Sequence, residues 1–213
     1  MSPDRPPATR LEVETPGGTG WIDLEQPGGS PRAVIALGHG AGGGVTAPDL
    51  VAVRTASLDA GFAVARITQP YRVAGRRAPA PAARLDEAWL AMIAALRRRR
   101  SLSALALVQG GRSSGARVAC RTANDAEAAA VVALAFPLHP PGKPQNSRLP
   151  ELIMPSAPTL VVQGDRDPFG MPPADAVTTR VVIEGADHGM KRSTALIGSA
   201  VVDFVESVLA KPL

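Results

Sequence analysis

The chain has 213 residues, of which 45% are hydrophobic and only 3% aromatic, with a formal net charge of +4. This composition is typical of a folded domain with an aliphatic core, and it excludes a disordered chain. The longest apolar runs, such as residues 128–137, are too short to span a bilayer. The arginines at 97–100 end an apolar helix and have almost no aromatic residue near them for base stacking. We therefore expect neither a nucleic acid nor a membrane as a partner.

Cysteine usage and the N-terminal residues bear on the cellular compartment. The N-terminal residues contain no apolar segment of the secretory type, and Cys120 is the single cysteine. One cysteine excludes an internal disulfide framework and is typical of a reducing compartment. We expect a cytoplasmic protein that is a monomer or a homodimer. We also expect residues 1–9 to form a flexible leader and residues 10–213 to fold as a single domain.

Strands and helices are expected to alternate along the chain. Two short strands flank a turn at 16–18, and a buried apolar strand over 33–37 runs into the glycine-rich loop GHGAGGG. The elements expected after it are helix 48–60, strand FAVARITQP, the loop YRVAGRRAPAPAA, helix 82–99, strand 104–108, helix 114–122, strand 129–136, loop 137–157, strand 158–163, strand 179–184 and helix 191–210.

This order predicts an α/β fold. The middle strands are continuously apolar, which is typical of parallel strands that helices cover on both faces. No linker divides the chain, and no internal repeat is visible. We therefore expect one doubly wound, mostly parallel sheet with helices on both faces. Functional residues of such sheets lie at the C-terminal ends of the strands, where the glycine-rich and acidic loops fall.

The segment GGRSSG lies between an expected strand and an expected helix, and it fits the pattern G-x-S-x-G. The pattern is typical of a nucleophile elbow, a sharp turn on which a serine takes strained backbone dihedrals. The residues two before and two after that serine must be small, because larger side chains collide with the strand and the helix. Gly111 and Gly115 meet this requirement for Ser113, whereas Arg112 excludes Ser114. Ser113 is the expected nucleophile, and Ser114 the expected donor of a backbone N–H to an oxyanion hole.

A serine hydroxyl needs a neighbouring base, and His188 is the expected one. It follows strand 179–184 and precedes the last helix, and in an elbow architecture the chain order is serine, acid, histidine. The segment GDRDP offers two acids between them. We favour Asp167, which lies further into the loop and is stiffened by the proline after it. Asp165 is the reserve, and Asp187 is a further candidate, although adjacent residues usually point apart.

The loop GHGAGGG is expected to complete the oxyanion hole, because it is small, exposes its backbone and follows an earlier strand. Ala41 is the expected N–H donor and Gly42 the alternative. His39 is expected to hold this loop through hydrogen bonds rather than to act as a base.

The substrate pocket is expected to be shallow and to be lined by loops 40–46, 69–76 and 137–150. Within these loops, Gly42, Arg72 and His139 are the candidate substrate-binding residues. Arg72, together with Arg76 and Arg77, is also a candidate for binding an anionic substrate.

The same glycine-rich loop satisfies G-x-G-x-x-G, the pattern of a dinucleotide site. That site requires an acid near the end of the next strand, but the strand ends in Gln69 and Pro70, and Asp59 lies before it. The fingerprint also normally follows the first strand of its unit, whereas two strands precede this loop. A phosphate-binding P-loop fails because GGRSSG lacks the Lys-Ser/Thr ending. We therefore expect no cofactor and no metal.

Six segments occur in the order HGAGGG, PYRVAGRRAPAP, QGGRSSGARVA, FPLHPPGKP, QGDRDPFG and GADHGM. In these segments the sequence resembles the small α/β-hydrolases of the dienelactone-hydrolase-like group, and more narrowly bacterial relatives of a testis-expressed hydrolase and of a subunit of the NSL histone-acetylation complex. The resemblance implies an α/β-hydrolase fold with a doubly wound sheet of about eight strands and no separate lid domain. It places the catalytic positions at Ser113, Asp167 and His188.

The sequence therefore predicts a serine hydrolase that cleaves a small acyl ester or thioester through an acyl-enzyme. Its partner would be a small-molecule acyl substrate. The alternative is a non-catalytic scaffold or binding protein that retains the fold, since a fold alone does not settle function.

Overall fold

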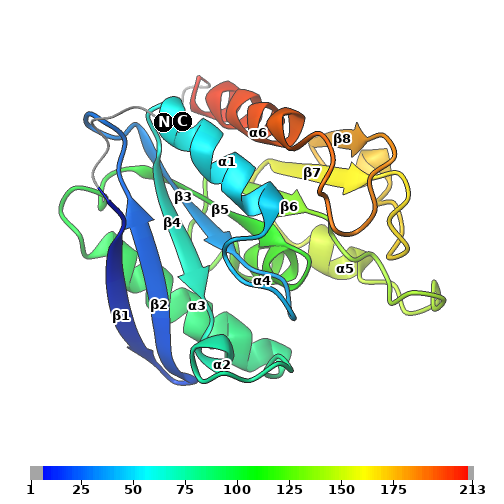
Figure 1. Ribbon diagram of the computed structural model, residues 1–213, viewed down its shortest axis with the longest axis horizontal. Coiled ribbons are helices and arrows are strands. Elements are labelled where there is room, and N and C mark those ends of the chain that lie inside the picture. The colour runs from blue at the N-terminus through cyan, green and yellow to red at the C-terminus, as the bar shows by residue number, and fades with distance from the viewer. Residues whose placement is uncertain (1–6, 211–213) are drawn as a thin grey trace.

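The computed structural model describes residues 7–210, which contain one eight-stranded sheet (Figure 1). Its strands lie in the order β1-β2-β4-β3-β5-β6-β7-β8. The β1–β2 and β2–β4 pairs are antiparallel and the remaining neighbours are parallel. The strands are β1 (Thr9–Thr15), β2 (Gly18–Glu25), β3 (Ala33–Gly38), β4 (Ala63–Thr68), β5 (Ala106–Arg112), β6 (Ala130–Leu134), β7 (Thr159–Gly164) and β8 (Thr179–Ile183).

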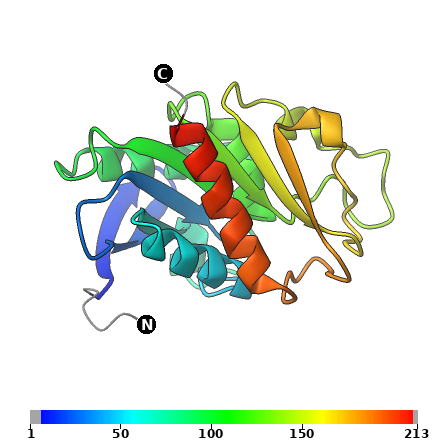
Figure 2. The same cartoon turned by 90° about the horizontal axis from the view of Figure 1, so that it is seen from above.

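Helices cover both faces of this sheet, as predicted. Figure 2 shows α1 and α6 side by side on one face, where Leu50 and Val201 pack against the side chains of β3 and β6. Helices α3 and α4 lie on the opposite face. The α/β fold expected from the alternation of strands and helices is therefore confirmed. The helices are α1 (Pro48–Asp59), α2 (Pro70–Val73), α3 (Ala82–Arg97), α4 (Ser114–Thr122), α5 (Leu149–Leu152) and α6 (Thr194–Leu209), with a 3-10 turn at Ala174–Ala176.

Several boundaries differ from those expected. Strand β5 continues through the two glycines to Arg112, because Gly111 and Arg112 still pair with β6. Short helices α2 and α5 interrupt the two expected loops, and each has a proline in its first turn, where the fixed φ favours a helix. Helix α6 begins at Thr194 rather than 191, because Ser193 has a left-handed φ of 49°.

The N-terminal boundary also shifts. Residues 1–6 of the expected leader lie outside the described residues. Strand β1 begins at Thr9, the last residue of that leader, because Thr9 pairs with Leu24 of β2. None of the helices formed by residues 7–210 is long and apolar enough to cross a membrane.

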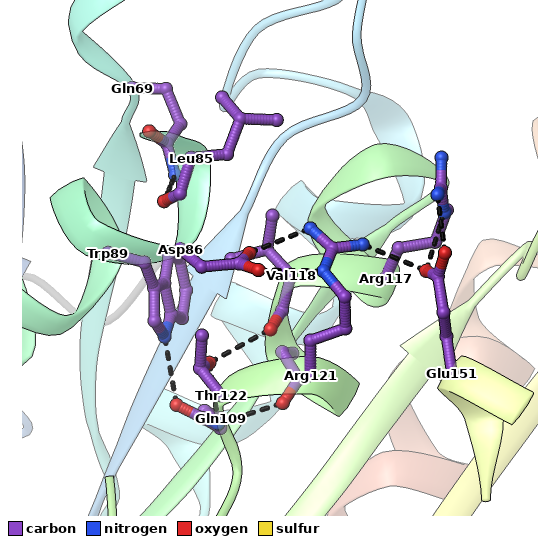
Figure 3. Close-up of polar contacts among 11 residues, drawn as sticks. Gln69, Leu85, Asp86, Trp89, Gln109, Arg117, Val118, Arg121, Thr122 and Glu151 are labelled. Atoms are coloured by element: carbon purple, nitrogen blue, oxygen red, sulfur yellow. Dashed lines mark hydrogen bonds and ion pairs between the residues drawn. The ribbon is translucent and has the colours of Figure 1, made fainter. Parts of the chain in front are cut away.

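Polar contacts hold α4 against its neighbours (Figure 3). Arg121 on α4 lies 2.7 Å from a carboxylate oxygen of Asp86 on α3 and 2.8 Å from one of Glu151 on α5. Arg117 contacts the same Glu151 at 2.6 Å. Two arginines of α4 therefore bind carboxylates on either side of this helix.

A second set of contacts in Figure 3 fixes α4 to the sheet beneath it. Trp89 Nε1 of α3 donates to Oε1 of the fully buried Gln109 on β5 at 2.9 Å. The amide nitrogen of Gln109 donates in turn to the carbonyl of Ala119 on α4 at 2.8 Å. Helix α3, strand β5 and helix α4 are thus joined by one buried glutamine.

Candidate active site

Ser113 lies on the turn between β5 and α4, with φ 52° and ψ −111°. Non-glycine residues rarely adopt a positive φ, so this backbone is strained. The turn passes directly beneath the end of β3. A Cβ on Gly115 would lie 2.5 Å from the carbonyl carbon of Gly38, and one on Gly111 would overlap the Gly38 oxygen. Both positions must be small, as predicted, although the main obstacle is β3 rather than β5 and α4.

The structure brings Ser113, His188 and Asp167 together. Nε2 of His188 lies 3.0 Å from Oγ of Ser113, and Nδ1 lies 2.8 Å from Oδ2 of Asp167. The Asp167 side chain is fully buried, whereas that of His188 is 22% exposed. The ring of Phe169 packs on the imidazole, with centroids 4.1 Å apart. These contacts place an imidazole between a hydroxyl and a carboxylate, the arrangement that a general base requires.

Two further groups hold the Asp167 carboxylate. The backbone N–H of Phe169 donates to Oδ1 at 2.9 Å, and the side-chain amide of Gln163 donates to Oδ2 at 2.9 Å. The two other candidate acids lie elsewhere. Asp165 is exposed, and Asp187 is exposed and accepts from the N–H of Gly189. Asp167 is therefore the acid that contacts His188.

The glycine-rich loop lies beside the elbow, and the side chains of His39 and Tyr71 hold it there. His39 Nε2 accepts from the backbone N–H of Gln69 at 3.1 Å, so its Nδ1 carries the proton and donates to the Gly40 carbonyl at 2.9 Å. Burial, together with the charge of Arg72, lowers the pKa of His39. His39 is thus a neutral structural group, and both of its nitrogens are occupied.

Ala41 is held from the outside of this loop. The hydroxyl of Tyr71 on α2 donates to the Ala41 carbonyl at 2.8 Å. Within residues 7–210, the backbone N–H groups of Ala41, Gly42 and Ser114 donate to no other group. All three N–H groups are therefore free to donate to a substrate oxygen. This observation does not distinguish Ala41 from Gly42 as the second donor beside Ser114.

The predicted substrate-binding side chains make local contacts. Arg72 donates to the Arg76 carbonyl at 3.2 Å. Nδ1 of His139 lies 2.9 Å from the Pro140 carbonyl, and its Nε2 edge packs against Gly170. Neither Arg72 nor His139 forms a hydrogen bond with the serine, histidine or acid described above. Arg76 lines a cavity of about 410 Å³ between α2, the start of α3 and the β1–β2 turn.

Arg112 and Gln163 contact the site although nothing in the sequence predicts them there. In the sequence, Arg112 only excludes Ser114 as the nucleophile, yet in the structure its guanidinium reaches Asp49 and the backbone of His188. In the sequence, Gln163 is only the last residue of an expected strand. Their partners are distant or in a loop, so local periodicity carries no signal for these contacts.

Cys120 is the single cysteine and lies on α4, two turns after Ser113. It is buried, and burial raises its thiol pKa to about 12. It packs with apolar side chains of α4, β6 and β7. A thiol in that state is a core side chain rather than a nucleophile. In the described part of the chain, no group of three or more His, Cys, Asp or Glu residues is placed to hold a metal ion.

Comparisons with known proteins bear on the family and the fold of the chain. The alpha/beta hydrolase domain family matches residues 31–200. The solved structures that are similar include XC6422 from Xanthomonas campestris, described as an α/β serine hydrolase without lid, with 19% identity, 97% of each chain covered and a TM-score of 0.75. Est1E from Butyrivibrio proteoclasticus is 17% identical, with 95% of this chain and 99% of that chain covered and a TM-score of 0.77.

A dienelactone hydrolase from Anabaena variabilis is 21% identical, with 96% of each chain covered and a TM-score of 0.72. None of the curated proteins matches the chain significantly. At such low identities the solved structures show the fold alone, whereas the family match extends over most of the sequence. The chain therefore belongs to the alpha/beta hydrolase domain family.

Proposed function

We propose that the protein is a serine hydrolase that cleaves small acyl esters or thioesters through Ser113, His188 and Asp167. The observation that carries the proposal is the continuous set of contacts from Oγ of Ser113 through the imidazole to the buried carboxylate. The strained backbone of Ser113 supports the same role, because strain of this kind is concentrated at functional residues. An intact arrangement of this type favours an enzyme over a scaffold that merely keeps the fold.

In the proposed reaction, His188 Nε2 takes the hydroxyl proton of Ser113 while Oγ attacks the acyl carbon. Asp167 accepts a hydrogen bond from Nδ1 and stabilises the imidazolium. The tetrahedral intermediate collapses when His188 returns the proton to the leaving alcohol or thiol, and the acyl group stays on Oγ. Water then attacks the acyl-enzyme with His188 as base again, and this releases the carboxylic acid and restores the serine.

The oxyanion of each tetrahedral intermediate would lie between the backbone N–H groups of Ser114 and Ala41. Ser114 is the first residue of α4, so the positive end of the helix dipole acts on the same oxygen. The free N–H groups support this assignment, and Gly42 is the alternative donor. Arg72, His139 and Gly42 remain the proposed substrate-binding residues.

Three further proposals rest on the sequence. The protein is proposed to be cytoplasmic, to be a monomer or a homodimer, and to be more closely related to the testis-expressed and NSL-complex hydrolases than to other members of the family. The absence of a lid in XC6422 supports a shallow pocket open to small acyl groups.

A fluorophosphonate probe and p-nitrophenyl acetate test the proposal together. The wild-type protein should label at Ser113 and hydrolyse the ester. Ser113→Ala should abolish labelling and lower kcat by about 10⁶-fold, as the loss of a triad nucleophile does. Ser114→Ala is the matched control, because it keeps its backbone N–H, and it should retain wild-type labelling. If Ser113→Ala keeps full esterase activity, or if Ser114 takes up the label, the proposal is wrong.

A further inference from the structure

Arg112 connects three segments that meet at the candidate site. It is the last residue of β5 and immediately precedes Ser113. Its Nε lies 2.9 Å from Oδ2 of Asp49, and its Nη2 donates to the carbonyl of His188 at 2.5 Å. Its Nη1 also lies beside Gly40, where an added Cβ would approach it to 3.2 Å. A single guanidinium therefore contacts α1, the glycine-rich loop and the loop that carries the imidazole.

Asp49 holds this guanidinium in place. Its side chain is fully buried at the start of α1, and its second oxygen accepts from the N–H of Leu50. Burial raises the pKa of Asp49, and the charge of Arg112 acts in the opposite direction. A buried carboxylate destabilises the fold unless it is paired with a cation. The folded state therefore favours the position of Arg112 in which its guanidinium contacts Asp49. Arginine suits this role because its planar fork donates in two directions at once.

The bond from Arg112 is the one hydrogen bond that the main chain of His188 makes within residues 7–210. The loop around His188 is anchored on either side by the buried Ala186 and Met190, and between these anchors the other main-chain hydrogen bonds join loop residues to each other, as in the contact from Gly189 to Asp187. The imidazole is oriented by Asp167 through Nδ1, and between the two buried anchors Arg112 fixes the carbonyl of His188. A shift of this backbone would move Nε2 relative to Oγ of Ser113.

We propose that Arg112, braced by Asp49, is a positioning residue that sets the distance between His188 and Ser113. Neither residue touches substrate in this role. The inference rests on the proposed function, because the distance between Nε2 of His188 and Oγ of Ser113 affects the rate only if the imidazole accepts the hydroxyl proton. Displacement of a catalytic group by about 1 Å can reduce the rate about 100-fold.

The test uses the full-length protein and three changes at the pair. The double variant Arg112→Met/Asp49→Asn removes both charges, so that no buried carboxylate is left unpaired. Arg112→Lys keeps the charge but loses the fork, and Asp49→Asn keeps the bond to the His188 carbonyl. We expect kcat for p-nitrophenyl acetate to fall about 10- to 100-fold in the double variant, with KM nearly unchanged, because the loss lies in alignment rather than in binding. The loss should be smaller in Arg112→Lys and smallest in Asp49→Asn.

Arg117→Lys is the matched control. Arg117 lies on α4, pairs with Glu151 and contacts none of the three proposed catalytic side chains. It should lower the thermal midpoint without changing kcat. The ring resonances of His188 in ¹⁵N NMR spectra provide a readout that does not depend on turnover. They should shift or broaden in the Arg112 variants and not in Arg117→Lys.

The outcomes separate the two proposals. A folded double variant with wild-type kcat and unchanged His188 resonances overturns the positioning role. If the double variant does not fold, the same result in Arg112→Lys overturns it. A loss of kcat in Arg117→Lys equal to that in the Arg112 variants also overturns it, because any weakening of α4 would then suffice. If the fluorophosphonate probe labels Ser113→Ala as fast as the wild-type protein, the proposed function is wrong. The NMR measurement then still decides whether Arg112 positions His188.

Discussion

Gln163 donates its side-chain N–H to Oδ2 of Asp167 at 2.9 Å, and the same oxygen lies 2.8 Å from Nδ1 of His188. The amide of Gln163 also donates to the carbonyl oxygens of Phe136 and Gly170. One buried amide therefore fixes the acid and ties together the segments that follow β6 and β7.

Gln163→Met should weaken both activity and stability. The side chain is of similar size, but the Gly170 carbonyl loses its donor, whereas Oδ2 of Asp167 keeps the contact with His188 and the Phe136 carbonyl keeps the N–H of Leu138. We expect a loss of about 1–3 kcal/mol in unfolding free energy for the one unsatisfied group. The Asp167 carboxylate then loses one of the two donors that hold it, so we expect kcat to fall about tenfold, in the range typical of lost positioning. Urea unfolding and p-nitrophenyl acetate hydrolysis measure the two effects. Wild-type kcat in the folded variant would show that Phe169 alone positions the acid.

Gln109→Met is the counterpart at a fully buried glutamine away from the candidate site. It leaves Trp89 Nε1 without an acceptor and the Ala119 carbonyl without this donor. The free energy of unfolding should fall by about 1–3 kcal/mol or more. Probe labelling, normalised to the folded fraction, should stay at the wild-type rate, because α4 keeps its ion pairs to Asp86 and Glu151. Selective loss of labelling at unchanged stability contradicts this expectation.

Gly115→Ala tests the packing beneath the elbow. The added methyl would lie 2.5 Å from the carbonyl carbon of Gly38 and 2.9 Å from the His39 oxygen, both of them backbone atoms that cannot rotate away. We expect a loss of about 1–3 kcal/mol in unfolding free energy, typical of overpacking, and slow labelling of Ser113. Gly28→Ala is the control, because a Cβ there meets nothing within 4 Å. Equal stability of the two variants would show that the elbow yields at no cost.

Acid should destabilise the protein through Glu25. Its side chain is 3% exposed and pairs with Arg54 and Arg66. Burial favours a raised pKa, but the two guanidinium groups outweigh it and leave the pKa of Glu25 lowered. The folded state therefore gains stability from Glu25 above its unfolded pKa of about 4.3 and loses it as the pH falls towards the folded value. Urea unfolding at a series of pH values should show a flatter acid slope in Glu25→Gln, and identical slopes would contradict this.

The sequence predicted the sheet and the order of its elements because each depends on local patterns. Continuous apolar runs identify buried parallel strands such as β3 and β7, and helical spacing identifies α3. The boundaries were less accurate where long-range pairing decides them. Strand β5 extends to Arg112 through contacts with β6, and two glycines in succession give no local signal for a strand.

The candidate site could be predicted in part for the same reason. The spacing of the glycines around Ser113 reflects a local steric requirement, and the chain order of acid and histidine follows from the topology of the sheet. The contact of Arg112 with Asp49 joins residues 63 positions apart. Nothing in either local segment indicates the other, so only the folded structure reveals the pair.

The chain order of the site has a consequence for synthesis of the protein. His188 is translated 75 residues after Ser113. At about 5–20 residues per second, the ribosome needs on the order of 4–15 s to cover that interval. A nascent chain therefore carries the serine without its imidazole until β7, β8 and the loop after them have been made and docked. We therefore expect Ser113 to become more reactive than an ordinary serine hydroxyl only after β7 and β8 have joined the sheet.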